Sequence, residues 1–446
     1  MSLVNLSRTG LALLVAAATF AGPVNGRPSY DYSDAASTDV ADAAAADVQA
    51  APAKISTGYF AGYHAKRKGI NFGVDKIQWD KYVDVKYAFA ETTADGSLNL
   101  SSSAPEELPK FVEAAHARKV KAQVAVGGWA GSIHFSSNVG SAENRTAFVK
   151  TCLDLVQKYN LDGLDFDWEY PNKQGLGCNA ISADDTANFI SFLTELRKAE
   201  PKPLLLTAAV SLYPYNDAAG KQSTNGALKR MGELLDYSIV MGYDVFGAWA
   251  PTGGPNAPLE QSCDARNNQG GIKEGIAKWI DAGIPAEKLV LGVGAYGHGF
   301  VVNPTDAFAA TTTGAAQALS AYPKNNGTRR QGSSWDDDAA VDACGNAQPP
   351  SGTFTFWSMV TEGKFLDETG KPRAGIASGY DECSQTPFLY DNSTSWWVSY
   401  DDAKSLSAKG KYITDNKLAG FSVWELGGDY KDIVVNAMRT SVGLKA

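Results

Sequence analysis

The strongest constraint on the fold is an eightfold alternation of short β-rich apolar runs with amphipathic stretches. One such stretch has apolar residues at 189, 192, 193 and 196, the i, i+3, i+4, i+7 spacing of a helix that packs on one face. Strand and helix repeated in this way predict an α/β protein with a parallel (β/α)8 barrel, the TIM barrel, whose site lies at the carboxyl ends of the strands. The predicted strands are residues 58–63, 83–90, 122–126, 161–169, 204–211, 238–243, 289–296 and 418–424.

The interval between the last two predicted strands is too long for a loop. It contains apolar segments, so we expect a small α+β insertion domain over residues 301–390 that forms one wall of a groove. Barrel strands one to seven are then expected over residues 56–300, and strand eight with a C-terminal helix over residues 391–446.

The N-terminal region has the features of a targeting segment. Arg8 precedes an apolar run over 11–21, and small residues follow, so residues 1–26 are predicted to be a secretory signal peptide. The run is shorter than the roughly 20 residues that span a bilayer. Residues 27–55, rich in Ala, Asp and Ser, predict a flexible leader. We expect a secreted, extracellular, monomeric protein with no membrane partner, and N-glycosylation at the sequons Asn99, Asn144, Asn326 and Asn392.

Export permits disulfides, and an odd count of five cysteines leaves one unpaired. Cys152 lies in an apolar helical stripe and is predicted to be a buried free thiol. We expect the other four to pair as Cys178–Cys263 and Cys344–Cys383.

Charge and residue spacing exclude several classes of partner. The net charge is −9 and no basic cluster follows the sequence, so nucleic acid and anionic membranes are disfavoured. The four histidines are scattered and no CxxC spacing occurs, so we predict neither a metal nor a cofactor. A neutral polysaccharide would not be repelled.

The fourth predicted strand carries the chemistry. Asp165, Asp167 and Glu169 alternate with apolar residues, so three acids share one face. Crowding and burial raise the pKa of such carboxyl groups. The one least able to ionise, either Asp167 or Glu169, is predicted to be a general acid. The alternative is an amphipathic strand whose acidic face is simply solvated.

The order Asp-Gly-x-Asp-x-Asp-x-Glu from Asp162 to Glu169 resembles the signature of the family 18 glycoside hydrolases, the chitinase family. Further segments resemble the family's motifs for strands one, two, three, six, seven and eight, at residues 58–60, 87–90, 127–129, 241–244, 296–297 and 423–425.

The resemblance implies substrate-assisted hydrolysis of β-1,4-linked N-acetylglucosamine polymers. Glu169 would protonate the glycosidic oxygen while the substrate's acetamido carbonyl attacks the anomeric carbon, giving an oxazolinium ion and retained configuration. Asp167 would hold the acetamido N–H and share a proton with Asp165. Tyr243 would hydrogen-bond the acetamido oxygen.

Aromatic residues gather at the predicted strand ends, where flat aromatic faces match the C–H faces of sugar rings. The resemblance implies that Trp424 forms the floor beneath the sugar before the cleaved bond and that Asp244 contacts this sugar. The predicted set that binds chitin and chitooligosaccharides is Tyr59, Tyr63, Phe89, Gly128, Trp129, Tyr170, Met241, Asp244, Trp249, Tyr296 and Trp424.

Two positions depart from the family pattern. Ala125 stands where the strand-three motif has a serine that supports the aspartates, and His298 stands where arginine is frequent. A chitin-binding lectin or effector without turnover is the alternative function, although such proteins usually lack the acid that Glu169 provides. An enzyme that trims N-glycans is a third hypothesis, which the insertion and the many aromatic residues disfavour.

Overall fold

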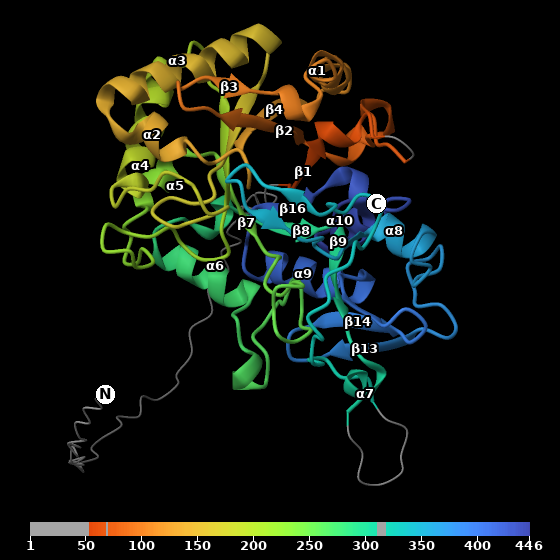
Figure 1. Ribbon diagram of the computed structural model, residues 1–446. Coiled ribbons are helices and arrows are strands. Elements are labelled where there is room, and N and C mark those ends of the chain that lie inside the picture. The colour runs from red at the N-terminus through yellow and green to blue at the C-terminus, as the bar shows by residue number, and fades with distance from the viewer. Residues whose placement is uncertain (1–52, 68–69, 310–317) are drawn as a thin grey trace, which may run out of the picture. The chain divides into compact units, whose positions relative to one another are not determined.

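The computed structural model describes residues 53–67, 70–309 and 318–446 (Figure 1). The predicted signal peptide and almost all of the predicted leader lie outside these residues. Within the part of the chain that is described, no helix combines the length and apolar composition that a membrane span requires.

Eight parallel strands form a closed ring in the order β1, β2, β4, β5, β6, β7, β8 and β16, with β16 paired back to β1. This confirms the predicted (β/α)8 barrel. The short strand β3 (Leu98–Asn99) pairs antiparallel with the end of β2. The barrel strands are β1 Ile55–Ala61, β2 Asp84–Thr92, β4 Lys121–Gly127, β5 Gly163–Asp167, β6 Leu205–Val210, β7 Tyr237–Met241, β8 Leu289–Gly294 and β16 Gly420–Trp424.

Helices between the strands cover the outside of the barrel (Figure 1). The predicted apolar stripe lies on α4, and its four residues are fully buried. Phe166 of β5 packs edge-on against Phe189 and Phe192 of this helix, which fixes the outward face of the strand. The helices outside the insertion are α1 Leu108–Ala117, α2 Phe135–Gly140, α3 Ala142–Tyr159, α4 Asp185–Ala199, α5 Lys229–Leu234, α6 Ile272–Asp281, α9 Ala403–Asp415 and α10 Ile433–Ser441. The 3-10 turns are η1 Gly62–His64, η2 Val74–Lys76, η3 Trp79–Lys81, η4 Ser101–Ser103, η5 Ala265–Asn267, η6 Ala286–Lys288 and η7 Leu426–Gly428.

Between β8 and β16 the chain builds a second, antiparallel sheet in the order β12, β9, β15, β14, β13. A separate hairpin, β10 with β11, belongs to the same interval. The elements are β9 Tyr296–Val301, α7 Pro304–Ala307, β10 Ala340–Val341, β11 Ala347–Gln348, β12 Thr353–Thr355, α8 Phe356–Thr361, β13 Ala377–Asp381, β14 Thr386–Asp391 and β15 Trp396–Ser399. We call the segment from β9 to β15, residues 296–399, the insertion.

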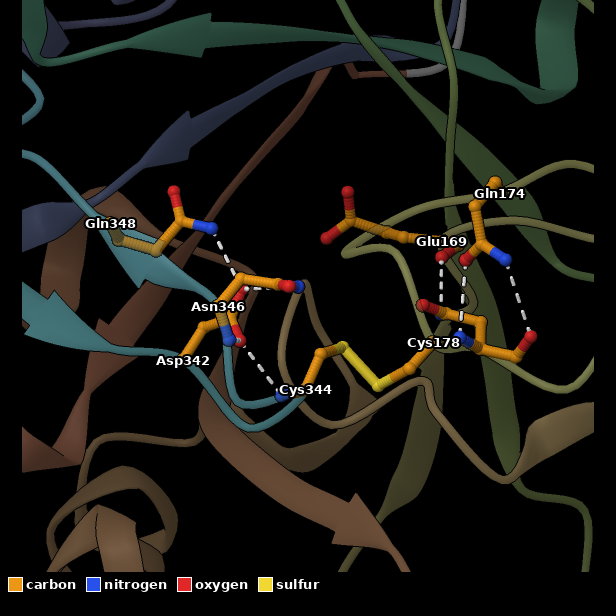
Figure 2. The surroundings of a disulfide bond; sticks show 8 residues. Glu169, Gln174, Cys178, Asp342, Cys344, Asn346 and Gln348 are labelled. Atoms are coloured by element: carbon orange, nitrogen blue, oxygen red, sulfur yellow. Dashed lines mark hydrogen bonds between the residues drawn. A yellow bond between two sulfur atoms is a disulfide. The ribbon is translucent and has the colours of Figure 1, made fainter.

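The disulfides connect Cys178 to Cys344 and Cys263 to Cys383, with Cα atoms 5.5 and 5.6 Å apart (Figure 2). The predicted pairing of Cys178 with Cys263 and of Cys344 with Cys383 was therefore wrong. Each bond joins a loop at the carboxyl end of a barrel strand to the insertion. The predicted pairs would instead have joined two loops of the barrel and two segments of the insertion. Cys152 is free and buried, as predicted.

Candidate active site

The three acids of β5 and its exit share one buried face. Asp165, Asp167 and Glu169 are 0%, 5% and 9% exposed, and the apolar residues between them face the surrounding helices. The hypothesis of a solvated acidic strand was therefore wrong. Glu169 lies two residues beyond the last residue of β5, at the carboxyl end of the barrel.

Asp165 is held by two hydroxyl groups inside the barrel. The Tyr59 hydroxyl donates to Oδ2 over 2.9 Å, and Thr207 Oγ1 donates to Oδ1 over 2.5 Å. In the sheet, Asp165 lies between Ala125 of β4 and Thr207 of β6. The hydroxyl that Ala125 lacks is thus matched by one from the opposite neighbour. Thr207 was not predicted from the sequence, because a threonine within an apolar strand is too common to mark a site.

A second polar cluster lies deeper in the barrel, at the amino ends of the strands. Lys86 is fully buried, pairs with Asp84, and donates to Thr57 Oγ1 over 2.7 Å and to the Tyr237 hydroxyl over 2.6 Å. We call Thr57, Asp84, Lys86 and Tyr237 the ion-pair cluster. In the sequence, the ion-pair cluster is marked only by a lysine inside the apolar run of β2. This lysine was not singled out as a prediction.

Burial raises the pKa of Asp165, and the positive charge of Lys86 and the two hydroxyl donors oppose this rise. Burial raises the pKa of Asp167 well above its ordinary value, and the nearby charges of Glu169 and Asp165 raise it further. Asp167 Oδ1 also has no hydrogen-bond partner among the described residues. Asp165 thus has a cation and two hydroxyl donors that favour its anionic form, whereas the neighbouring charges of Asp167 all favour its protonated form.

Burial raises the pKa of Glu169 to about 7, with a hydrogen bond from Tyr170 opposing the shift and the charge of Asp244 adding to it. A carboxyl group with this pKa exchanges its proton near neutral pH, as a general acid must. The buried acids of β5 and its exit therefore form a proton-carrying group, which we call the carboxyl cluster (Asp165, Asp167 and Glu169).

A cleft of about 740 Å³ opens above these acids. Its aromatic floor is built by Trp424, whose ring centroid lies 5.4 Å from those of both Tyr59 and Phe89. Trp129 is half exposed on the rim. The predicted site residues that line the cleft are Tyr59, Tyr63, Phe89, Gly128, Trp129, Asp167, Glu169, Tyr170, Met241, Tyr243, Asp244 and Trp424.

Three predicted residues are not part of this lining. Asp165 lies below it inside the barrel, and Tyr296 donates to Asp244 Oδ1 over 2.7 Å. Trp249 is exposed and lies 5.2 Å from the ring of His298. His298 Nε2 lies 2.7 Å from Asp244 Oδ1, so the histidine that departs from the family pattern contacts this carboxyl group.

Polar residues that were not predicted from the sequence complete the lining. Glu91 lies near the carboxyl end of β2. The others come from loops whose sequences carry no strand or helix period, so no pattern marked them. Among the described residues of the insertion, Asp337 contributes to the cleft. The missed residues that bear polar groups include Glu91, Lys173, Tyr213, Asn216, Gln269 and Asp337. In the described part of the chain, no group of three or more His, Cys, Asp or Glu side chains is arranged to hold a metal ion.

Comparisons with known proteins agree with this geometry. The family described as glycosyl hydrolases family 18 matches residues 55–429. A chitinase-like effector of Moniliophthora roreri is 46% identical over 397 residues, covering 89% of this chain and 94% of the relative. A chitinase-like effector of Moniliophthora perniciosa is 44% identical and covers 87% of each chain. The crystal structure of a chitinase from Rhizomucor miehei superposes with a TM-score of 0.76 at 32% identity, over 87% of this chain and 100% of the other.

Proposed function

This chain belongs to family 18 of the glycosyl hydrolases, and we propose that it is a chitinase that cleaves β-1,4-linked N-acetylglucosamine polymers with retention of configuration. The observation that carries the proposal is the carboxyl cluster, three buried acids with raised pKa values beneath an aromatic cleft. Buried acids that keep a proton near neutral pH are rare outside sites that use it. The aromatic floor offers apolar faces to sugar rings.

In the proposed reaction, the protonated Glu169 carboxyl group donates its proton to the glycosidic oxygen as the bond to the anomeric carbon breaks. The substrate's acetamido oxygen attacks that carbon, which forms an oxazolinium ion without an enzyme nucleophile. The Glu169 carboxylate then takes a proton from water. The water oxygen attacks the anomeric carbon from the face that the leaving group has left, which opens the oxazolinium ring. Because both displacements invert the anomeric centre, the configuration is retained.

The neighbouring acids serve the cationic intermediate. Asp167 Oδ1, unpaired within the described residues, is free to accept the acetamido N–H. Anions fixed in a buried site stabilise developing positive charge more strongly than water does. Tyr243 would donate to the acetamido oxygen, and Trp424 would carry the sugar whose bond is cleaved. Asp165, held by two hydroxyl groups, would share a proton with Asp167.

A second candidate function is chitin binding without turnover. It is favoured by the names of the two relatives at 46% and 44% identity, both chitinase-like effectors. The missing hydroxyl at Ala125 is compatible with it. The retained Glu169 and the donor at Thr207 support the enzyme.

One experiment separates the two functions. The purified chain and Glu169→Gln are incubated with a fluorogenic chitotriose conjugate, and chitooligosaccharide binding is measured by calorimetry. We expect hydrolysis by the parent and a loss of about 10²–10⁴ in kcat in the variant, which keeps the side-chain shape without the transferable proton. Binding by both proteins with hydrolysis by neither would instead establish the lectin or effector function.

We also propose that residues 1–26 direct secretion, that the leader runs from residue 27 to the residues just before β1, which begins at Ile55, and that the protein acts as a monomer outside the cell. The two disulfides support export from the cell, because such bonds form in oxidising compartments. Mass spectrometry of the N-terminal peptide and the glycopeptides of the exported protein would test it. A first residue well before 27 would contradict the assigned signal peptide.

A further inference from the structure

The chain that follows β5 turns back onto the peptide groups of Glu169. Asn179 is buried, and its Nδ2 donates to the carbonyl oxygen of Glu169 over 3.0 Å. From the other side, the amide of Glu169 donates to Ser132 Oγ over 3.0 Å. The backbone that carries the Glu169 side chain is therefore held at both of its peptide groups.

Asn179 is held in turn by its own loop. Gln174 Oε1 accepts from the amide of Asn179 over 3.1 Å, and Gln174 Nε2 donates to the carbonyl of Asn179 over 3.4 Å. Gly175 packs so closely that a Cβ there would lie 2.1 Å from the Glu169 carbonyl oxygen. Gln174 is exposed, so water competes for these bonds, and a modest net free energy remains from each.

The disulfide adds a covalent restraint next to Asn179. Cys178 precedes Asn179 and is bonded to Cys344 in the turn between β10 and β11. Figure 2 shows Glu169 and Gln174 on one side of this bond, with Asp342, Asn346 and Gln348 on the other.

The turn at the far end of the bond is itself well ordered by hydrogen bonds. Asp342 Oδ1 accepts from the amides of Cys344 and Asn346 over 2.9 and 2.8 Å. Asp342 Oδ2 accepts from Gln348 Nε2 over 2.7 Å. The bond thus ties the loop after β5 to a braced hairpin that lies 166 residues away in the sequence.

We propose that Asn179 is a positioning residue for Glu169 and that the Cys178–Cys344 disulfide keeps Asn179 in place, which couples the insertion to the acid. The inference rests on the proposed role of Glu169 as proton donor. It has a physical basis, because misplacing a reacting group by about 1 Å can cost about a hundredfold in rate.

The second disulfide supplies a matched control. Cys263–Cys383 also joins a barrel loop to the insertion, with a comparable sequence separation of 120 residues, and its cysteines are similarly exposed. Cys178→Ser with Cys344→Ser is compared with Cys263→Ser and Cys383→Ser on fluorogenic chitotriose. The first pair should lower kcat by about tenfold or more with KM nearly unchanged, and the control pair should keep kcat within about twofold.

Asn179→Ala in the disulfide-bonded parent should reproduce the loss in kcat, because it removes the donor and leaves the bond. Equal losses in the two double variants would indicate general destabilisation and would overturn the proposal. So would an unchanged kcat in Asn179→Ala.

Amide hydrogen exchange of residues 169–180 gives a readout that needs no turnover. Exchange should be faster in Cys178→Ser/Cys344→Ser than in the parent and in the control pair. Should the parent hydrolyse nothing, the chitinase function fails, whereas the exchange comparison still decides whether this disulfide holds the Glu169 backbone. Identical exchange in all three proteins would overturn the coupling.

Discussion

Two of the buried groups of charged side chains, the ion-pair cluster and the carboxyl cluster, are built on opposite principles. In the ion-pair cluster, Lys86 and Asp84 compensate each other, and two hydroxyl groups satisfy the remaining bonds. In the carboxyl cluster, three acids stand together, and burial raises the pKa of each. A buried charge must be either paired or neutralised by a proton. The ion-pair cluster pairs its charges. The carboxyl cluster neutralises acids with protons, which leaves it a proton to transfer.

The largest expected effect comes from breaking the ion-pair cluster. Lys86→Met keeps the side-chain length but leaves Asp84 buried without its cation, which should lower the free energy of unfolding by about 3–5 kcal/mol. Chemical denaturation measures this loss. Asp84→Asn added to Lys86→Met removes the stranded charge and should recover part of the stability; a double variant less stable than Lys86→Met would contradict the pairing argument.

Asp167→Asn tests the opposite cluster. It should reduce kcat by about 10²–10³, because a fixed group that stabilises the transition state is altered. It should also stabilise the fold at neutral pH. The raised pKa means that folded Asp167 binds a proton which the unfolded chain releases above about pH 4, so parent stability falls as pH rises toward the folded-state pKa.

That fall amounts to about 1.4 kcal/mol per pH unit for a single such group, and Asp167→Asn should lack this contribution. Denaturation midpoints of the parent and the variant between pH 4 and pH 8 measure the difference. Parallel stability curves for the two proteins would show that Asp167 is ionised in the fold.

The pH dependence of catalysis sharpens the contrast further. Glu169 must be protonated to act, and its pKa is about 7, so kcat/KM should fall about tenfold per unit above that pH. Tyr170→Phe removes the hydrogen bond that lowers this pKa and should move the alkaline limb to higher pH. Initial rates across pH 5–9 test both, and a limb that begins near pH 4.5 would mean an ordinary glutamate.

The smallest expected effect concerns the hydroxyl donors of Asp165. Thr207→Val leaves one oxygen of Asp165 without its donor, which should cost about 1–3 kcal/mol in stability and lower kcat severalfold. Thr207→Ser keeps the hydroxyl and serves as the control. Adding Ala125→Ser to Thr207→Val places a hydroxyl on the opposite neighbour of Asp165 and should restore part of the activity. Equal rates for Thr207→Val and Thr207→Ser would show that the Thr207 hydroxyl does not contribute to activity through Asp165.

Much of the site could be predicted from local order. The period of two along β5 placed its acids on one face, and the apolar runs located all eight barrel strands to within a few residues. Parallel strands in a closed barrel bring their carboxyl ends together, so aromatic residues at separate strand ends had to meet. Trp424, Tyr59 and Phe89 do so, whereas Tyr296 and Trp249 are not among the residues that line the cleft.

By itself, the sequence determined the barrel, the order of its strands and the faces of its acids, because these follow from periodicities carried by neighbouring residues. The tertiary structure alone decided the pairing of the cysteines, the choice of Thr207 as partner of Asp165 and the return of Asn179 to Glu169. Each of these contacts joins segments that meet only when the barrel closes or when the insertion folds against it. The spacing of residues along the chain does not predict such long-range contacts, since loops of many lengths can bring the same two side chains together.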